Sequence, residues 1–439
     1  MLNKIFFSNS KKNYSGVQNC REIENKQNEP IVLVVIRTYP PRFSGAGLRI
    51  HRLLINIKKY YRHYAEVVTL QPDGQKTREL ITHFLDGIKI NLVSVRTSCK
   101  PKNYIVKFME ILDLLFFFYK YLNKNPHFRI IHVVGGSWFG LASIIVGKLL
   151  GRKIILEQTL LGADDPLTLT KKNKIHFLTI GWLKLFVLKK MVDKIICISP
   201  ALEKANLEVG IDKEKIWTRP NSVSSEDFFP IQSRKEKLTL RRKLGLPIND
   251  NILLSVGRIC ERKNQIFLVK SLRWLDVQAN VTLLLIGPLH KKDEYYYYKL
   301  INLAQEYNDK NKKLIIIPKA MDNIGEYMRA SDIFVFASKA EGFGNVLLEA
   351  LMSGLPVVMK YLPRISELII RNQYCGRIVR DENPTEFAKA IKEVLNSIIK
   401  ENELDYRIKL HQETNRHYNY EDYIKGYVQI YNTLLQMKE

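Results

Sequence analysis

Two glutamates lie on either side of a glycine-rich turn in the second half of the chain. Glu341 precedes the turn Gly342-Phe343-Gly344-Asn345, and Glu349 follows it by about one helical turn. Both carboxylates can point into one site, where one would hold sugar hydroxyls and the other a ribose. Free N–H groups at the start of the next helix favour a phosphate or sugar oxygen there. Alternatively, Glu341 caps the helix and Glu349 is a solvated surface residue.

Local sequence patterns place this turn between a strand and a helix. The apolar run 333–336 predicts a buried strand, and Gly342 and Gly344 allow a sharp turn after it. From Asn345 onward, apolar residues recur at helical spacing until the segment 354–356, Gly-Leu-Pro, ends the helix. The order strand, glycine turn, helix therefore positions both glutamates.

Two cations follow another predicted strand, at residues 252–257. Arg258 can bond two phosphate oxygens at once, and Lys263 adds a compact charge. A nucleoside diphosphate gains negative charge as it leaves a sugar, and fixed cations stabilise that charge. Basic residues after a strand are otherwise usually solvated.

A second glycine turn lies near the start of the chain. The apolar run 31–36 predicts a buried strand, which leads into Gly45 and Gly47 and then a helix that carries His51. Strand, glycine turn and helix thus recur. Alone this signal is weak, because glycine turns after strands are common in packing and His51 can be a residue at the edge of the core.

Together these segments resemble the retaining nucleotide-sugar glycosyltransferases of the GT-B type, glycosyl transferases group 1 or family 4-like. The residues that match are the E-x7-E signature from Glu341 to Glu349 and the V-G-R-x4-K motif at 256–263. The resemblance spans roughly residues 31–400, strongly in the second half and loosely in the first. It implies an α/β fold class with two Rossmann-like doubly wound domains that face each other across a cleft.

The resemblance also implies roles for particular residues of a hexosyltransferase-type enzyme. Catalytic roles fall to Glu341, Arg258 and Lys263. Donor or acceptor binding falls to Gly45, Gly47, Gly342, Phe343, Gly344, Asn345 and Glu349. No Asp-x-Asp pair occurs in the chain, so we expect no metal and no cofactor besides the nucleotide-diphosphate sugar that serves as donor substrate.

The first domain departs from the family pattern near the end of the strand at 153–156. Members often carry a histidine there, close to the reacting sugar, and this chain has none. Glu157, Thr159, Asp164 or Asp165 could contact the acceptor instead. Asp-Asp-Pro at 164–166 is equally a signal for a turn or a helix start.

Alternating apolar runs and helical patterns predict the order of domains. Over residues 30–222 this alternation predicts a parallel sheet with helices on both faces, the acceptor domain. Residues 223–415 would form the donor domain, and the charged segment up to residue 250 would be its linker. Residues 1–29 read as a flexible extension, and the helix at 416–439 is expected to cross back onto the first domain.

Charge is concentrated in the first half of the chain. The formal net charge is +25, and residues 1–200 hold 32 Lys and Arg against 13 Asp and Glu. Such a field attracts anions, among them lipid phosphates and anionic glycans. The helix predicted at 104–122 and the stretch 171–194, which contains the helix predicted at 173–191, mix aromatic residues with lysines, and this suits an anionic membrane surface. Core-facing helices with solvated lysines would look the same.

Cysteine usage and apolar run lengths indicate the compartment. The five cysteines are scattered, with no C-x-x-C pair, and suggest neither disulfides nor a zinc site. No uninterrupted apolar run reaches the length that spans a bilayer. We therefore expect a cytoplasmic protein that binds peripherally to the inner face of the membrane.

These observations predict a metal-independent retaining transferase that moves a sugar to a hydroxyl of a glycan or lipid-linked acceptor in cell-surface polysaccharide or glycolipid synthesis. A nucleotide-sugar epimerase of the same architecture would turn over donor without acceptor. A non-catalytic subunit that binds sugar nucleotides or anionic glycans is another alternative. Nucleic acid is not an expected partner, because no recognition motif accompanies the charge.

Overall fold

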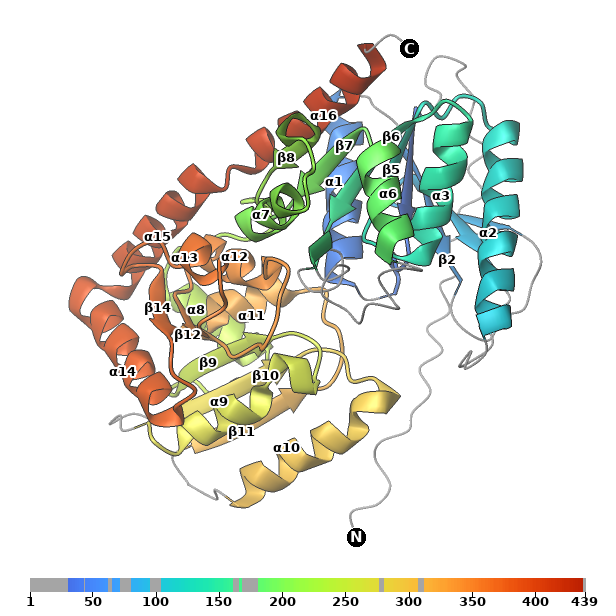
Figure 1. Ribbon diagram of the computed structural model, residues 1–439. Helices are drawn as coiled ribbons and strands as arrows, with labels where there is room; N and C mark the ends of the chain where they lie inside the picture. Colours follow the sequence, from blue (N-terminus) through green and yellow to red (C-terminus); the bar gives the residue numbers. More distant parts are fainter. Residues whose placement is uncertain are drawn as a thin grey trace.

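The computed structural model describes residues 31–42, 44–61, 65–71, 80–94, 104–160, 166–167, 181–275, 280–306 and 312–436. The extension predicted at 1–29 and the candidates Asp164 and Asp165 lie outside these residues. The described chain forms two α/β domains, each with its own sheet, and a last helix that returns to the first domain (Figure 1). The two-domain α/β fold predicted from the sequence is confirmed.

The first domain contains an eight-stranded sheet. Its strands are β1 (Val32–Ile36), β2 (Ala65–Leu70), β3 (Ile81–Leu85), β4 (Ile88–Val93), β5 (Ile130–Val134), β6 (Lys153–Gln158), β7 (Lys194–Cys197) and β8 (Ile216–Thr218). They lie in the order β3-β4-β2-β1-β5-β6-β7-β8. All neighbouring strands are parallel except β3 and β4. The buried strands β1 and β5 occupy the middle of the sheet.

The antiparallel pair β3–β4 corrects the expectation of a purely parallel sheet. Asp86 and Gly87 join the two strands and have φ angles of 50° and 74°. A two-residue turn with positive φ at both positions matches the twist of a hairpin, and Asp-Gly is a preferred sequence for it. The edge hairpin was therefore encoded locally.

Helices cover both faces of this sheet. They are α1 (Gly45–Tyr61), α2 (Tyr104–Lys124), α3 (Trp138–Leu149), α6 (Trp182–Lys190) and α7 (Pro200–Glu208). Helix α3 lies between α2 and α6 on one side of the first domain (Figure 1). The helix predicted at 173–191 is thus described only over α6.

The second domain contains a six-stranded parallel sheet. Its strands are β9 (Asn251–Val256), β10 (Val281–Ile286), β11 (Lys312–Ile317), β12 (Ile333–Phe336), β13 (Val357–Lys360) and β14 (Gly376–Val379). Their order is β11-β10-β9-β12-β13-β14. The helices of this half are α8 (Arg234–Lys243), α9 (Gln265–Leu272), α10 (Glu294–Glu306), α11 (Ile324–Ala330), α12 (Asn345–Met352), α13 (Ser366–Ile369), α14 (Pro384–Glu401) and α15 (Glu403–His417).

Helix α8 shows that the predicted linker up to residue 250 was wrong in part. Ser233 caps its first turn by accepting a hydrogen bond from the N–H of Glu236. Lys237 and Arg241 are buried, because they reach a carboxylate of the second domain. The charged composition that suggested a linker instead belongs to a packed helix of the second domain.

The last helix, α16 (Tyr420–Gln436), lies on the first domain against α1 and β5 (Figure 1). Its Tyr427 hydroxyl donates a 2.9 Å hydrogen bond to Glu157, which also forms a buried ion pair with Arg49 of α1. Glu157 is fully buried, so its proposed contact with an acceptor is wrong. Burial, together with the charge of Arg49, lowers the pKa of His132 beside this pair to about 3.

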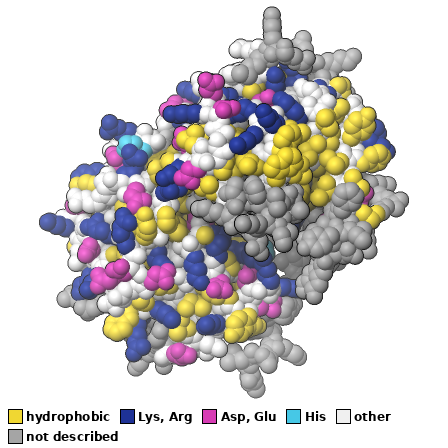
Figure 2. Space-filling view, in the orientation of Figure 1, with side chains coloured by type: hydrophobic (Ala, Val, Ile, Leu, Met, Phe, Trp, Pro, Cys, Tyr) yellow, Lys and Arg dark blue, Asp and Glu magenta, His cyan; other side chains and the backbone are white. Residues whose placement is uncertain are grey.

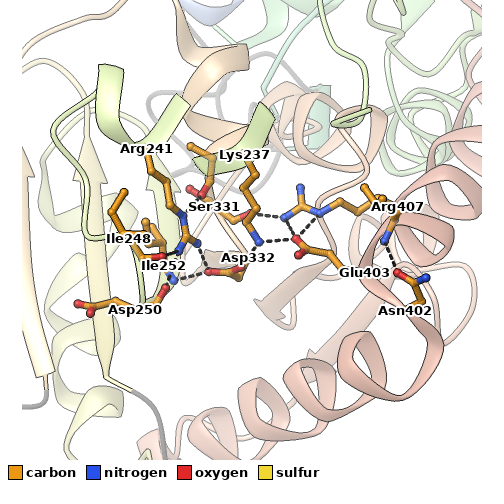
Figure 3. A network of polar contacts seen from close by, with 12 residues as sticks. Lys237, Arg241, Ile248, Asp250, Ile252, Ser331, Asp332, Asn402, Glu403 and Arg407 are labelled. Atoms are coloured by element: carbon orange, nitrogen blue, oxygen red, sulfur yellow. Dashed lines mark hydrogen bonds and ion pairs between the residues drawn. The ribbon is translucent and has the colours of Figure 1, made fainter. Parts of the chain in front are cut away.

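A network of buried charges ties α8 to the amino ends of β9 and β12 (Figure 3). Asp332 accepts hydrogen bonds from Lys237 at 2.5 Å, from Arg241 at 2.7 Å and from the N–H of Ile252 at 2.6 Å. Lys237 also contacts Glu403 of α15. Burial opposes ionisation of Asp332, but Lys237 and Arg241 outweigh it and hold the pKa of this carboxyl below its usual value.

We expect Asp332→Asn to lower the free energy of unfolding by about 1.5–3 kcal/mol, because charge-assisted hydrogen bonds are lost. The pKa of Asp332 is lower in the folded chain than in the unfolded chain. Its carboxylate therefore stabilises the fold fully above the unfolded-state pKa of about 3.9, and this stabilisation is lost as pH falls through the folded-state pKa. The difference between wild type and variant in urea unfolding should therefore shrink below about pH 4. The control is Asp322→Asn, at an exposed position. An equal loss of unfolding free energy in this control would contradict the stabilising role of Asp332.

Candidate functional site

The glycine turn leads from the carboxyl end of β12 into α12. Gly344 caps the helix with φ 84°, in the left-handed region that glycine tolerates best. Phe343 is buried and meets the ring of Tyr418 edge to face at 6.3 Å, so it anchors the turn in the second domain. The predicted strand, turn and helix are therefore present, and the first turn of α12 begins at Asn345.

Glu341 lies at the centre of a compact charged cluster. Its Oε1 accepts hydrogen bonds from Ser338 at 2.7 Å and Arg262 at 2.8 Å, and Lys263 Nζ lies 2.7 Å from the same oxygen. Only 11% of the Glu341 side chain is exposed. Burial alone would raise the pKa of Glu341, but Lys263 and Arg262 outweigh burial, so the pKa is lowered and the carboxylate stays ionised.

Lys263 is held in place by the segment that follows β9. Its ammonium lies over the ring of Phe336 at 5.0 Å. A side-chain carbon at Gly257 would come within 3.1 Å of Lys263 Cε, so glycine at that position leaves room for the lysine. The backbone N–H of Lys339 donates a 2.8 Å hydrogen bond to the carbonyl of Arg262, and this bond joins the two motifs seen in the sequence.

Arg258 pairs with a carboxylate other than that of Glu341. Its Nε and Nη2 donate to Asp293 Oδ2 at 3.0 and 2.5 Å. About a quarter of the side chain, 28%, is exposed. An anion that binds the Arg258 guanidinium would therefore have to compete with the Asp293 carboxylate.

Glu349 pairs with a residue of the other domain. Its Oε1 lies 3.2 Å from Arg52 Nη1 on α1, and the Arg52 guanidinium also lies over the ring of Phe228 at 5.3 Å. Burial raises the pKa of Glu349, and Arg52 offsets this only in part. The second glutamate of the signature is thus engaged across the domain boundary.

The turn before α12 touches the first domain at two further points. Asn345 accepts a 2.6 Å hydrogen bond from Asn221. A side-chain carbon at Gly342 would lie 1.9 Å from the carbonyl oxygen of Thr159. Gly342 is therefore required by the close approach of the two backbones, and the carboxyl ends of β6 and β12 lie together at the domain boundary.

The first glycine turn shapes the start of α1. A side-chain carbon at Gly47 would lie 2.6 Å from the carbonyl oxygen of Thr38, whereas one at Gly45 would meet nothing within 4 Å. His51 is buried and hydrogen-bonded to Tyr39 and Asp86, both at 2.9 Å. This matches the alternative in which His51 is a histidine at the edge of the core.

Sequence reasoning missed three residues that the fold brings to the site. Arg262 could have been predicted from the sequence, since it is adjacent to Lys263 within the matched motif. Asp293 and Arg52 carried no local signal, because they reach Arg258 and Glu349 from other elements. Of the predicted residues, the fold joins Glu341 to Lys263 and leaves Arg258 and Glu349 with partners of their own.

The arrangement concentrates positive charge around one buried carboxylate. Lys263, Arg262 and Arg258, with the N-terminus of α12, can stabilise a diphosphate that becomes more negative during a reaction. Among the described residues, no group of three or more His, Cys, Asp or Glu side chains is placed to hold a metal ion.

Comparison with protein families gives one match, the glycosyl transferases group 1, over residues 236–411. This range contains the second sheet and every residue of the Glu341 cluster. Among curated proteins, the UDP-Gal:alpha-D-GlcNAc-diphosphoundecaprenol alpha-1,3-galactosyltransferase of Escherichia coli is 26% identical over 324 residues, which is 72% of this chain and 77% of the relative. Seven further curated relatives align over 42–61% of their own lengths.

Solved structures resemble the whole described architecture. The sucrose-phosphate synthase of Thermosynechococcus elongatus superimposes with a TM-score of 0.71 at 19% identity, over 93% of this chain and all of that one. Anabaena Alr3699/HepE, in complex with UDP and glucose, superimposes with a TM-score of 0.68 at 17% identity, over 92% of this chain and 99% of that one. At such identities the likeness concerns the fold, in which both sheets are kept.

Proposed function

Because this chain is a glycosyltransferase of the group 1 family with the GT-B fold, we propose that it transfers a sugar from a nucleotide-diphosphate sugar to a hydroxyl of a glycan or lipid-linked acceptor. The transfer retains the configuration of the anomeric carbon and needs no metal ion. The observation that carries this proposal is the cluster of Glu341 with Lys263 and Arg262 beside the start of α12.

In this mechanism the bond between the anomeric carbon and the diphosphate breaks while the acceptor oxygen bonds to the same face of the sugar. Lys263 and Arg258 stabilise the departing diphosphate, since both cations lie after β9. The diphosphate takes the proton of the acceptor hydroxyl, so no side-chain base is required. Glu341 orients the sugar hydroxyls. Glu349 binds the ribose once the ion pair between Glu349 and Arg52 has separated.

The charge distribution of the chain and a relative's acceptor support an acceptor at a membrane surface. The galactosyltransferase of Escherichia coli named above acts on a diphosphoundecaprenol-linked sugar, and the basic excess of this chain lies in its first half. In the described part of the chain, no helix is both long and apolar enough to cross a bilayer. We place the protein peripherally on the inner face of the membrane, in cell-surface polysaccharide or glycolipid synthesis.

We expect a single nucleoside diphosphate among UDP, GDP, ADP and TDP to raise the melting temperature of the wild type, equally with and without EDTA. A ligand at a hundred times its Kd adds about 2.7 kcal/mol of stability, so binding should be visible in a thermal-shift assay. The double variant Arg258→Ala/Lys263→Ala should lose this shift, because both phosphate-binding cations are gone.

Two controls sharpen this experiment. Lys243→Ala removes an exposed lysine that pairs with Glu326, away from the cluster, and should keep the shift. If no nucleoside diphosphate raises the melting temperature of the wild type, the proposed donor site is refuted. If EDTA abolishes the increase, metal independence is refuted.

A further inference from the structure

The first domain lies directly against the first turn of α12. Gly342 is buried, and a side-chain carbon at this position would lie 1.9 Å from the carbonyl oxygen of Thr159. Asn221, which is 2% exposed, donates a 2.6 Å hydrogen bond to Asn345. A nucleoside diphosphate that binds at this turn would therefore have to compete with contacts from the first domain.

The chain crosses between the domains twice, and the two crossings are bonded to each other. The first crossing joins β8 to α8, and the second joins α15 to α16. Ser222 of the first crossing donates a hydrogen bond to the carbonyl of Tyr418 in the second, and both side chains are buried. The space-filling surface of the two domains is continuous on this side of the molecule, where α15 leads into α16 (Figure 1, Figure 2). A rotation of one domain against the other would be absorbed at these joined crossings, which we call the hinge.

One stripe of α1 contacts both the hinge and the second domain. The Arg52 guanidinium lies over the buried ring of Phe228 in the first crossing at 5.3 Å, and Arg52 Nη1 lies 3.2 Å from Glu349 Oε1 on α12. One turn later, the amide of Asn56 donates at 3.4 Å to the hydroxyl of Tyr420 at the start of α16. Because Arg52 contacts the hinge and α12 together, a rotation at the hinge would stretch or break its bond to Glu349.

The Arg52–Glu349 pair is accessible enough to be exchanged for a ligand. Its two side chains are 31% and 15% exposed, whereas those of Arg49 and Glu157, another pair made by α1, are 6% and 0% exposed. Burial raises the pKa of Glu349, and Arg52 offsets this only in part, so the carboxylate gains from further hydrogen-bond donors. Ribose hydroxyls are such donors, and they can replace the guanidinium without leaving the carboxylate unpaired.

We propose that the Arg52–Glu349 pair is an autoinhibitory latch, which holds the two domains together over the donor site of the free protein and opens when the ribose of a nucleoside diphosphate binds Glu349. This inference rests on the proposed function, since it concerns the regulation of the same donor site. Arg52 and the ribose then compete for one carboxylate. The apparent affinity for the nucleotide is therefore the intrinsic affinity reduced by the fraction of molecules in which the latch is open.

Isothermal titration of UDP, GDP, ADP and TDP into the purified chain tests this competition. Arg52→Gln removes the charge that Glu349 binds, so it should bind the preferred nucleotide about threefold to fivefold more tightly than the wild type. Arg129→Gln makes the same change at an exposed position of the first domain, at the amino end of β5, and should leave the affinity unchanged. Weaker binding by Arg52→Gln would overturn the proposal, because it would show that Arg52 orients Glu349 for the ribose.

The conservative variant Arg52→Lys distinguishes the charge of Arg52 from its shape. Only Nη1 of the guanidinium forms the hydrogen bond to Glu349, and a lysine ammonium can replace a single bond of this kind. Arg52→Lys should therefore bind the nucleotide within about twofold of the wild type. Binding as tight as that of Arg52→Gln would overturn the proposal, since the ion pair would then not be what restrains the site.

Small-angle X-ray scattering reports the state of the latch without any nucleotide. Arg52→Gln should have a larger radius of gyration than the wild type and Arg129→Gln, because its domains separate more often. The wild type offers the same test without a substitution, since salt screens a partly exposed ion pair: its radius should increase between about 50 and 500 mM NaCl, whereas that of Arg52→Gln should not. Equal radii of all three proteins at both salt concentrations would overturn the proposal.

Failure of the latch is separable from failure of the donor site. If none of these nucleotides binds either the wild type or Arg52→Gln, the proposed donor site is refuted. If one nucleotide binds both proteins with equal affinity and their radii of gyration agree, the latch alone is refuted.

Discussion

Replacing Lys263 by alanine should lower the rate constant of sugar transfer by about 10²–10³-fold, equivalent to about 2.7–4 kcal/mol of transition-state stabilisation. The lysine is 12% exposed, and its position is fixed by Phe336 and Glu341. A cation held in a site of low polarity needs little reorganisation when the diphosphate gains charge. Nucleoside diphosphate binding should weaken as well, because the same charge attracts the ground-state anion.

The matched control for this prediction is Lys339→Ala. Lys339 follows β12, is 50% exposed and pairs with the exposed Glu261. Exposed ion pairs contribute little, so transfer and binding should stay near wild-type values. Single-turnover rates and calorimetric Kd values for UDP or the diphosphate chosen by the thermal-shift panel give both quantities. Equal losses in the two variants would mean that general surface charge, and not the position of Lys263, matters.

Replacing Glu341 by glutamine should reduce transfer by about 10²-fold or more, while nucleoside diphosphate binding is kept or tightened. The amide oxygen can still accept from Ser338 and Arg262, so the turn should keep its shape. The negative charge that Lys263 and Arg262 share would be gone, leaving both cations more available to an anion. Transfer falls because sugar hydroxyls lose the acceptor that orients them, and small misplacements can cost about 10²-fold.

Glu261→Gln is the control for this second variant. Glu261 is 80% exposed and lies in the same short segment as Lys263, so its loss should leave both kcat and Kd unchanged. The prediction is contradicted if Glu341→Gln transfers at the wild-type rate, or if it loses diphosphate binding as Lys263→Ala does. The opposite effects of the two variants on binding distinguish orientation of the sugar from stabilisation of the leaving group.

Local patterns predicted the parts of the site that consist of consecutive residues. The turn from Glu341 to Asn345 lies between β12 and α12 as expected, and Lys263 follows β9, because glycines, apolar runs and helix boundaries act over a few residues. Arg262 could have been added from its neighbour. The Asp-Gly hairpin after β3 was equally local and was overlooked.

The sequence by itself determined a two-domain α/β chain with the glycine turn at 342–344, the V-G-R-x4-K motif and a basic first half, since periodicity, glycine turns and charge are properties of short segments and of composition. Only the tertiary structure decided which charges meet. It placed Arg258 on Asp293, Arg52 on Glu349, Glu157 in a buried pair with Arg49, and Lys237 on Asp332. A buried charge must find a partner from whichever element packs against it, and the sequence does not specify that neighbour.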